Sequence, residues 1–171
     1  PAAIKSRGRY WLTYLVLRYS GARLGEVLAL RDEQDVDFRQ GEIKLITLKR
    51  HSKTANGARK PKRVPVRSVP VPLRVCSELG LYIGQHPGMR GQVFKLDQGN
   101  FRRVFYRRAD EAGVPRDLAH PHILRHTRAM ELCRAGIPLT GIQNLLGHSS
   151  LNTTAIYLRL SNARSEERRV G

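Results

Sequence analysis

Two residues near the end of the chain have side chains that could do chemistry on phosphorus. In the stretch "GHSSLNTTAIYLRLS", His148 precedes Tyr157 by nine positions, across residues that read as a short helix. A tyrosine hydroxyl can attack phosphorus, and a histidine can stabilise the charge that develops. The alternative is structural: Tyr157 would be an ordinary residue of an amphipathic helix, and His148 an ordinary residue after a helix stop. Other parts of the chain favour the chemical interpretation.

Breaking a DNA strand without a metal ion requires a defined set of side chains. The phosphodiester gains charge in a pentacoordinate transition state, and arginines neutralise this charge because their planar fork binds two oxygens at once. A nucleophile must reach phosphorus, and an acid must protonate the departing sugar oxygen. Two arginines, a histidine, a lysine and a tyrosine would suffice. The chain offers Arg23, Lys53, His122, Arg125, His148 and Tyr157.

The sequence around these residues forms recognisable phrases. They are "SGARLGEVLAL", "RHSKTANG", "HILRHT", "LLGHSS" and "NTTAIYLRL". These phrases resemble the motifs of the tyrosine recombinase, or phage integrase, family. The continuous run "HILRHTRAMELCRAGIPLTGIQNLLGHSSLNTTAIY" is similar to the family in both its motifs and their spacing, and the resemblance covers nearly the whole chain.

The resemblance implies a role for each residue. Tyr157 would be the nucleophile that forms a 3′-phosphotyrosyl bond and frees a 5′-hydroxyl. Arg23 and Arg125 would bind the non-bridging oxygens, and His148 would donate to the same phosphate. Lys53 would be the general acid for the leaving 5′-oxygen. The remaining implied roles are proton transfer at the tyrosine by His122 and support of Arg23 by Glu26. We expect His126 to pack and hydrogen-bond beneath the site.

The same resemblance implies that no metal ion or nucleotide cofactor takes part. His122 and His126 are four residues apart, a spacing that could indicate a metal site. The glutamate of an H-E-x-x-H motif is missing, however, and the sequence shows no evident third ligand. We therefore expect no cofactor.

The charge of the chain predicts a polyanionic partner. Lysine and arginine number 31 against 14 acidic residues, which gives a formal net charge of +17. Nucleic acid is the polyanion that such a charge most commonly indicates. The resemblance implies that this partner is double-stranded DNA. The basic residues concentrate in a polar connection with an Asn56-Gly57 turn signal, which predicts a β-hairpin laid against DNA. A solvated edge hairpin that uses lysines to deter aggregation is the alternative. The expected DNA-binding residues are Lys49, Arg50, Arg59, Lys60, Lys62 and Arg63.

Apolar periodicity predicts an α+β fold that is mostly α-helical, with a small antiparallel sheet of about three strands on one side. Helices are expected around Trp11 to Leu17, after the Ser20-Gly21 break, over residues 73–85, 100–113 and 122–135, after Pro138, and around Tyr157. Strands are expected over residues 42–49 and 62–67, and a further short extended piece over 91–97.

The domain prediction is a catalytic domain over residues 1–161 and a mobile C-terminal tail over 162–171. Because the chain begins with Pro1, we expect a fragment from which the N-terminal core-binding domain is absent. The resemblance implies a monomer when free and a homotetramer on DNA during synapsis. With no C-x-x-C spacing, no signal peptide and no apolar run long enough for a bilayer, a cytoplasmic, nucleoid-associated protein is expected.

Two other functions fit parts of the sequence. A type IB topoisomerase uses the same chemistry but relaxes supercoils as a monomer, and the "LLGHSS" and "TTAIY" phrases favour the recombinase over it. A non-catalytic helix-turn-helix module would use Ala135-Gly136-Ile137 as its turn and residues 138–146 as its recognition helix. That module would explain the charge but would not account for Arg23 and Tyr157.

Overall fold

The structure is a computed structural model that describes residues 8–47, 65–148 and 154–157. Its elements follow in the order α1 (Arg9–Ser20), α2 (Leu24–Leu28), α3 (Asp32–Asp35), β1 (Val36–Asp37), β2 (Glu42–Ile46), β3 (Val66–Pro70), α4 (Leu73–Gln85), the 3-10 turn η2 (Pro87–Met89), α5 (Gln98–Glu111), α6 (His122–Arg134) and α7 (Leu139–Leu146). Residues 154–157 are also helical. The α+β class and the small antiparallel sheet are therefore confirmed.

The break between the first two helices follows from local chemistry. Gly21 adopts a φ of 64°, a left-handed conformation that glycine tolerates, and its N–H donates to the carbonyl of Leu17. The Ser20 hydroxyl donates to the carbonyl of Val16 and accepts from the N–H of Ala22. The chain thus turns sharply after α1, and Arg23 comes to lie directly before α2.

The sheet has the strand order β1-β2-β3, with both pairs antiparallel. Ile43 and Leu45 of β2 and Val69 of β3 are buried, as alternation predicts. In the β2–β3 register, Leu45 lies opposite Arg67. The same alternation therefore turns an arginine toward the interior.

The extended piece expected over residues 91–97 is not a strand. Val93 and Phe94 are fully buried, but the backbone there joins no sheet, and the N–H of Val93 donates to the carbonyl of Leu30. The third strand is instead Val36–Asp37, which pairs with β2 across a tight turn at Gly41. A short apolar run indicates burial but does not by itself indicate a partner strand.

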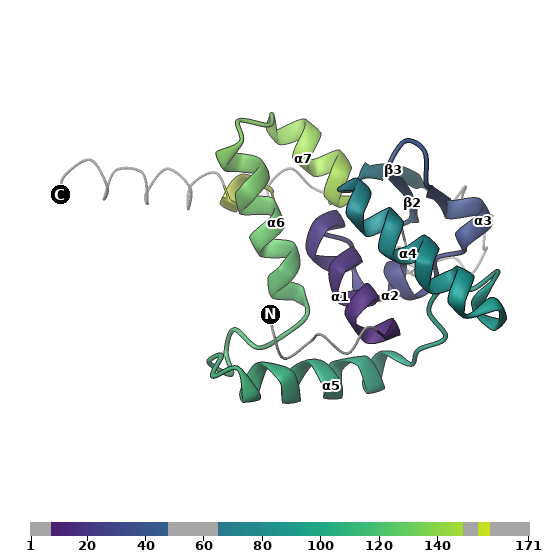
Figure 1. Cartoon of the computed structure of the whole chain (residues 1–171). Coiled ribbons are helices and arrows are strands. Elements are labelled where there is room, and N and C mark those ends of the chain that lie inside the picture. The colour runs from purple at the N-terminus through teal and green to yellow at the C-terminus, as the bar shows by residue number, and fades with distance from the viewer. Residues whose placement is uncertain (1–7, 48–64, 149–153, 158–171) are drawn as a thin grey trace, which may run out of the picture.

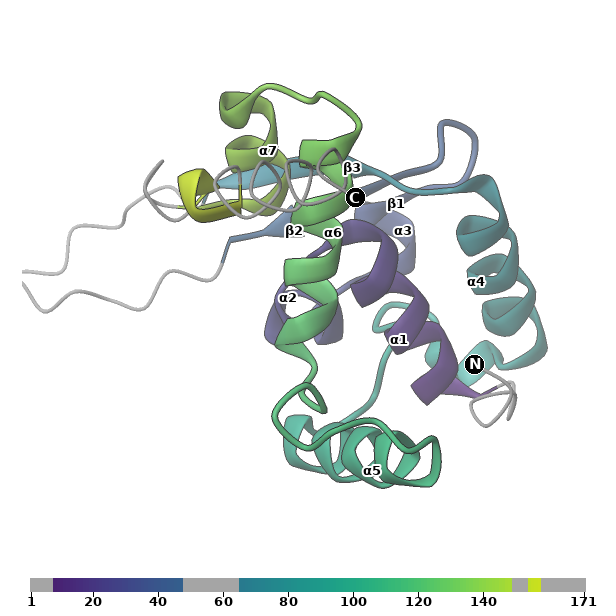
Figure 2. The same ribbon diagram turned by 90° about the vertical axis from the view of Figure 1, so that its left-hand side faces the viewer.

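The core lies between the sheet and helices α1, α2 and α4, and a smaller apolar cluster lies between α6, α7 and the helical residues 154–157. Helix α6 packs along α1, and Arg18 of α1 forms a two-pronged ion pair with Glu131 of α6. Helix α5 lies at the end of the molecule opposite α7 in both views (Figure 1 and Figure 2). Figure 2 also shows the short yellow helix 154–157 beside α7.

Some expectations fall outside the described residues. They include the hairpin turn, the C-terminal tail, and the residues Lys49, Arg50, Lys53, Arg59, Lys60, Lys62 and Arg63. Among the helices that are described, none combines the length and the apolar character needed to cross a bilayer.

Candidate functional site

Four segments of the chain meet at one place and bring together those expected residues that the structure describes. The N-terminus of α2 supplies Arg23, the first two turns of α6 supply three residues, the turn after α7 supplies His148, and the final described helix supplies Tyr157. The rings of His148 and Tyr157 are stacked, with 6.2 Å between their centroids and an interplanar angle of 13°. The residues from α6 are His122, Arg125 and His126.

Arg125 is the most deeply buried of these residues, with 2% of its surface exposed. Its Nη1 donates to the carbonyl of Gly21 at 2.7 Å, whereas its Nη2 is buried without any hydrogen-bond partner among the described residues. Burial, and after it the charge of Arg23, lowers the pKa of Arg125 to about 10, so the group is still cationic at pH 7. A buried cationic donor without a partner is a group prepared for an anion.

Arg23 lies closer to the surface, with 39% of its side chain exposed. Its Nη1 donates to Oε1 of Glu26 at 3.0 Å, and both terminal nitrogens lie 3.4 Å from the carbonyl of Gly147. The backbone N–H of Arg23 also donates to Glu26, at 3.0 Å. Arg23 is thus held from two sides while its exposed edge remains free to meet a ligand.

Glu26 has no exposed side-chain surface and pairs with two arginines. Burial acts to raise the pKa of Glu26, but hydrogen bonds from Arg67 and from the backbone of Arg23 outweigh it and hold the pKa below its usual value. The carboxylate is therefore ionised and supports Arg23 directly. Arg67 is the partner that sequence reasoning missed; the alternation that places Arg67 on the inner face together with Val69 was the available signal.

His148 follows the left-handed Gly147 that ends α7. Its Nδ1 is hydrogen-bonded to Oγ1 of Thr154 at 2.8 Å, which links the turn to the tyrosine helix. Burial, with the charges of Arg125 and Arg23 nearby, lowers the pKa of His148 to about 4, so the ring is neutral at pH 7. In the tautomer whose Nδ1 accepts from the Thr154 hydroxyl, the single ring proton is on Nε2 and is available to an oxyanion.

Tyr157 is docked in the site, with 6% of its surface exposed. Its ring packs on the apolar cluster between α6 and α7, and its hydroxyl is hydrogen-bonded to Nδ1 of His126. Burial raises the pKa of the Tyr157 hydroxyl, although Arg125 opposes the shift, so the hydroxyl keeps its proton at pH 7. The apolar cluster consists of Ala129, Leu132, Ile142 and Leu146.

The two histidines of α6 differ in their contacts with Tyr157. His126, expected to pack and hydrogen-bond beneath the site, is hydrogen-bonded to the Tyr157 hydroxyl. Proton transfer at the tyrosine by His122 stays a prediction. The rings of His122 and His126 meet edge to face at 4.7 Å. Burial, and then the neighbouring His126, lowers the pKa of His122 to about 4. In the part of the chain that is described, no three His, Cys, Asp or Glu residues are grouped as a metal site.

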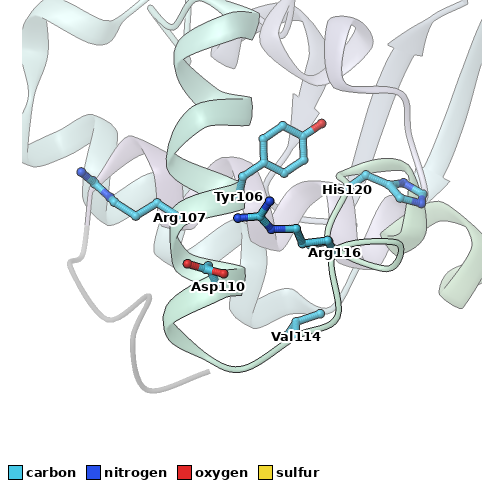
Figure 3. Close-up of a pocket in the computed structure, with 7 residues that line it drawn as sticks. Tyr106, Arg107, Asp110, Val114, Arg116 and His120 are labelled. Carbon is cyan, nitrogen blue, oxygen red and sulfur yellow. The ribbon is translucent and has the colours of Figure 1, made fainter.

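A hollow surface leads away from these residues. A pocket of about 480 Å³ between α2, α5 and the start of α6 is lined by Arg23, Arg102, Tyr106, His120 and His122, among others. A neighbouring pocket of about 580 Å³ shares Tyr106 and His120 with it. Figure 3 shows Tyr106, Arg107 and Asp110 projecting from α5 and Arg116 and His120 from the loop that follows. Arginines therefore continue the basic character of the site along α5.

A mostly helical domain that surrounds a buried tyrosine with two arginines and several histidines is typical of enzymes that transfer a phosphodiester to tyrosine. The family model described as "Phage integrase family" matches residues 3–164. This chain belongs to the phage integrase family.

Relatives agree with this assignment. The candidate integrase/recombinase y4gC of Sinorhizobium fredii is 38% identical over 82% of this chain and 71% of its own length. A tyrosine recombinase of Pseudothermotoga lettingae is 31% identical over 89% of this chain, and the tyrosine recombinase XerA of Thermococcus kodakarensis is 30% identical over 91%. This chain spans only 50% and 52% of those two proteins.

Solved structures show the same fold. The crystal structure of XerA recombinase matches 99% of this chain and 60% of its own chain, with a TM-score of 0.76 and 27% identity. The XerH recombinase bound to its difH substrate matches 92% of this chain and 44% of its own, with a TM-score of 0.67 and 26% identity. The matched part of these longer proteins is thus a single domain-sized region.

Proposed function

We propose that this chain is the catalytic part of a site-specific tyrosine recombinase that cuts and rejoins DNA strands. The observation that best supports the proposal is the Tyr157 hydroxyl docked against His126, in a site that also holds Arg125, Arg23 and a neutral His148. Nη2 of Arg125 is a buried donor without a partner among the described residues. Family membership and the recombinase relatives support the same activity.

The reaction uses one in-line exchange at phosphorus. The Tyr157 oxygen forms a bond to phosphorus as the bond from phosphorus to the 5′-oxygen breaks, and the leaving oxygen takes up a proton. Arg125 and Arg23 stabilise the charge on the non-bridging oxygens, and His148 donates from Nε2. Preorganised donors of this kind contribute about 3 to 4 kcal/mol each in comparable sites. The energy of the broken bond is kept in the phosphotyrosine, so the reverse attack by a 5′-hydroxyl rejoins the strand.

The proton of Tyr157 passes to His126, whose Nδ1 is already hydrogen-bonded to the hydroxyl. The transfer requires the tautomer in which Nδ1 carries no proton. Burial lowers the pKa of His126, so the ring is neutral and can accept a proton at pH 7. Lys53 remains our candidate for the general acid at the 5′-oxygen, and His122 remains a candidate participant in proton transfer. This division gives the attacking and the leaving oxygen separate proton partners.

Double-stranded DNA is the proposed substrate. The net charge of +17, the arginines along α5 and the difH-bound state of the XerH relative support it. We further propose that residues 1–161 form the catalytic domain of a longer protein, and that four copies assemble on DNA for strand exchange. The share of each relative that the chain spans supports the first of these proposals.

The test uses a library of randomised duplexes that each carry a nick just 3′ of the candidate cleavage position. After cleavage the short fragment diffuses away, so the protein stays trapped on DNA as an SDS-resistant adduct. We expect an adduct in EDTA that maps to Tyr157 and is absent from Tyr157→Phe. Tyr82→Phe is the matched control, because Tyr82 is buried to the same 6%. An unchanged adduct in Tyr157→Phe would overturn the assignment.

A further inference from the structure

Arg67 lies behind the site and contacts three separate segments of the chain. The sequence did not identify it as a site residue. Its Nε donates to the carbonyl of Leu145 at 2.9 Å, and its Nη1 donates to Oγ1 of Thr47 at 2.8 Å. Its Nη2 donates to Oε2 of Glu26 at 2.6 Å, with Nη1 3.4 Å from Oε1. One guanidinium thus joins the end of β2, the helix α2 and the end of α7.

We propose that Arg67 is a positioning residue for the DNA-cleavage reaction, which holds Arg23 and His148 in place through Glu26 and through the end of α7. The proposal rests on the proposed recombinase function. Arg67 itself does not reach the substrate: only 10% of its side chain is exposed, and it lines neither of the two described pockets.

The link to Arg23 is electrostatic. Glu26 is a single buried negative charge shared by two arginines, and its side chain has no exposed surface. With Arg67 in place, the carboxylate is divided between two partners, so Arg23 keeps part of its positive field for a phosphate. Without the fork of Arg67, Glu26 would pair with Arg23 alone and could draw it away from the phosphate. A lysine keeps the charge of Arg67 but not its planar, two-pronged geometry.

The link to His148 is steric and works through Gly147. A Cβ placed on Gly147 would lie 2.8 Å from Nη1 and 2.9 Å from Cζ of Arg67, so the guanidinium lies flat against the backbone there. The carbonyl of Leu145, two residues earlier, accepts from Nε of the same group. The carbonyl of Gly147 in turn lies 3.4 Å from Arg23. Arg67 therefore fixes the turn from which His148 projects.

The test compares Arg67→Lys with Arg39→Lys, an exposed arginine in the β1–β2 turn. Two quantities are measured on the nicked duplexes: the rate of adduct formation at saturating DNA in a single turnover, and the separate Kd for DNA. We expect Arg67→Lys to lose on the order of 100-fold in rate, the scale of a displacement of about 1 Å in a site, with an unchanged Kd. Arg39→Lys should match the wild type in both quantities.

A double-mutant cycle with Glu26→Gln separates positioning from a general structural effect. If Arg67 acts through Glu26, Arg67→Lys and Glu26→Gln together should lose far less than the product of the two single losses. A rate equal to that of Arg39→Lys, a loss confined to Kd or folding, or two fully multiplicative losses would each overturn the inference. A wild type that forms no adduct would instead overturn the recombinase function, and the inference with it.

If Arg67→Lys fails to fold, Thr47→Val tests the positioning role of Arg67 instead. This variant removes one hydrogen-bond acceptor of Arg67 and leaves the guanidinium in place. We expect an adduct rate about threefold lower at unchanged Kd, as for the loss of one ordinary hydrogen bond. A rate equal to that of the wild type would overturn the inference.

Discussion

The Tyr157 hydroxyl and Nδ1 of His126 are joined by a hydrogen bond, across the interface between α6 and the last described helix. Their ring centroids are 5.5 Å apart and tilted by 49°. His122, one turn earlier on α6, meets the ring of His126 rather than the tyrosine. The contact makes His126, a residue expected to pack and hydrogen-bond beneath the site, our proposed acceptor of the tyrosine proton.

Replacing His126 by alanine is therefore expected to slow adduct formation by about 100-fold, the low end of the usual contribution of general acid–base catalysis. The measurement is the single-turnover rate on nicked DNA at saturation, with His122→Ala measured beside it. The rate of His126→Ala should fall while its Kd for DNA stays the same. A wild-type rate in His126→Ala would show that the contact is structural only.

Arg125→Met is expected to abolish the adduct without loss of stability. The arginine is 2% exposed, one of its nitrogens has no described partner, and Arg23 and Arg67 add repulsion. Replacing a buried charge by an apolar side chain of similar length is often neutral or stabilising. Thermal unfolding should give a Tm equal to or above that of the wild type, while adduct formation falls by about 100-fold or more. A clearly lower Tm would mean that the hydrogen bond from Nη1 of Arg125 to the carbonyl of Gly21 stabilises the fold by more than the buried charge destabilises it.

Stability is expected to fall as the pH drops from 7 to 5. The pKa of His122 and of His148 is about 4 in the folded protein, below the ordinary 6.5, so the unfolded chain binds more protons in this window. Their contribution is complete above about pH 6.5 and is lost as the pH falls toward 4. Calorimetry at several pH values measures it. The double variant His122→Gln and His148→Gln should show a flatter dependence, and an equal slope would contradict the assignment.

Gly147→Ala is expected to destabilise the fold and slow the reaction together. The residue has a φ of 70°, and the added Cβ would meet the Arg67 guanidinium at 2.8 Å. The backbone strain alone costs about 1 to 2 kcal/mol. Gly136→Ala is the matched control, because Gly136 has a φ of 74° and open space around it. Urea unfolding should show the larger loss for Gly147→Ala, and only that variant should also lose adduct rate.

Much of the fold could be predicted because the decisive signals are local. The apolar spacing gave helix α4 its observed bounds, Leu73–Gln85, and the alternation of Ile43 with Lys44 and Leu45 marked β2. Residues 91–97 do not form a strand, because Val93 and Phe94 are apolar for burial in the core and not for pairing with a neighbouring strand. No pattern within seven residues distinguishes these two causes.

The sequence predicted which residues belong to the site better than it predicted the contacts between them. Motif spacing identified the residues that the structure brings together, but His122 and His126 share one helical face, and only the packing of the tyrosine helix decides which one reaches Tyr157. Arg67 was one basic residue in a run of many, and its distinction is that its strand turns it inward. The alternation along β3 indicates that Arg67 faces inward, but the side chains it contacts there are set by packing between distant segments.

Nη2 of Arg125, which has no hydrogen-bond partner among the described residues, also links binding at the site to thermal stability. An oxyanion that accepts a hydrogen bond from this donor binds the folded chain and not the unfolded one. Its binding therefore also raises the free energy of unfolding. At a ligand concentration of about 100 times Kd, this linkage adds about 2.7 kcal/mol to the free energy of unfolding. The catalytic centre is therefore also a place where the substrate helps to hold the protein together, and a shift in Tm reports binding even in variants that cannot cut.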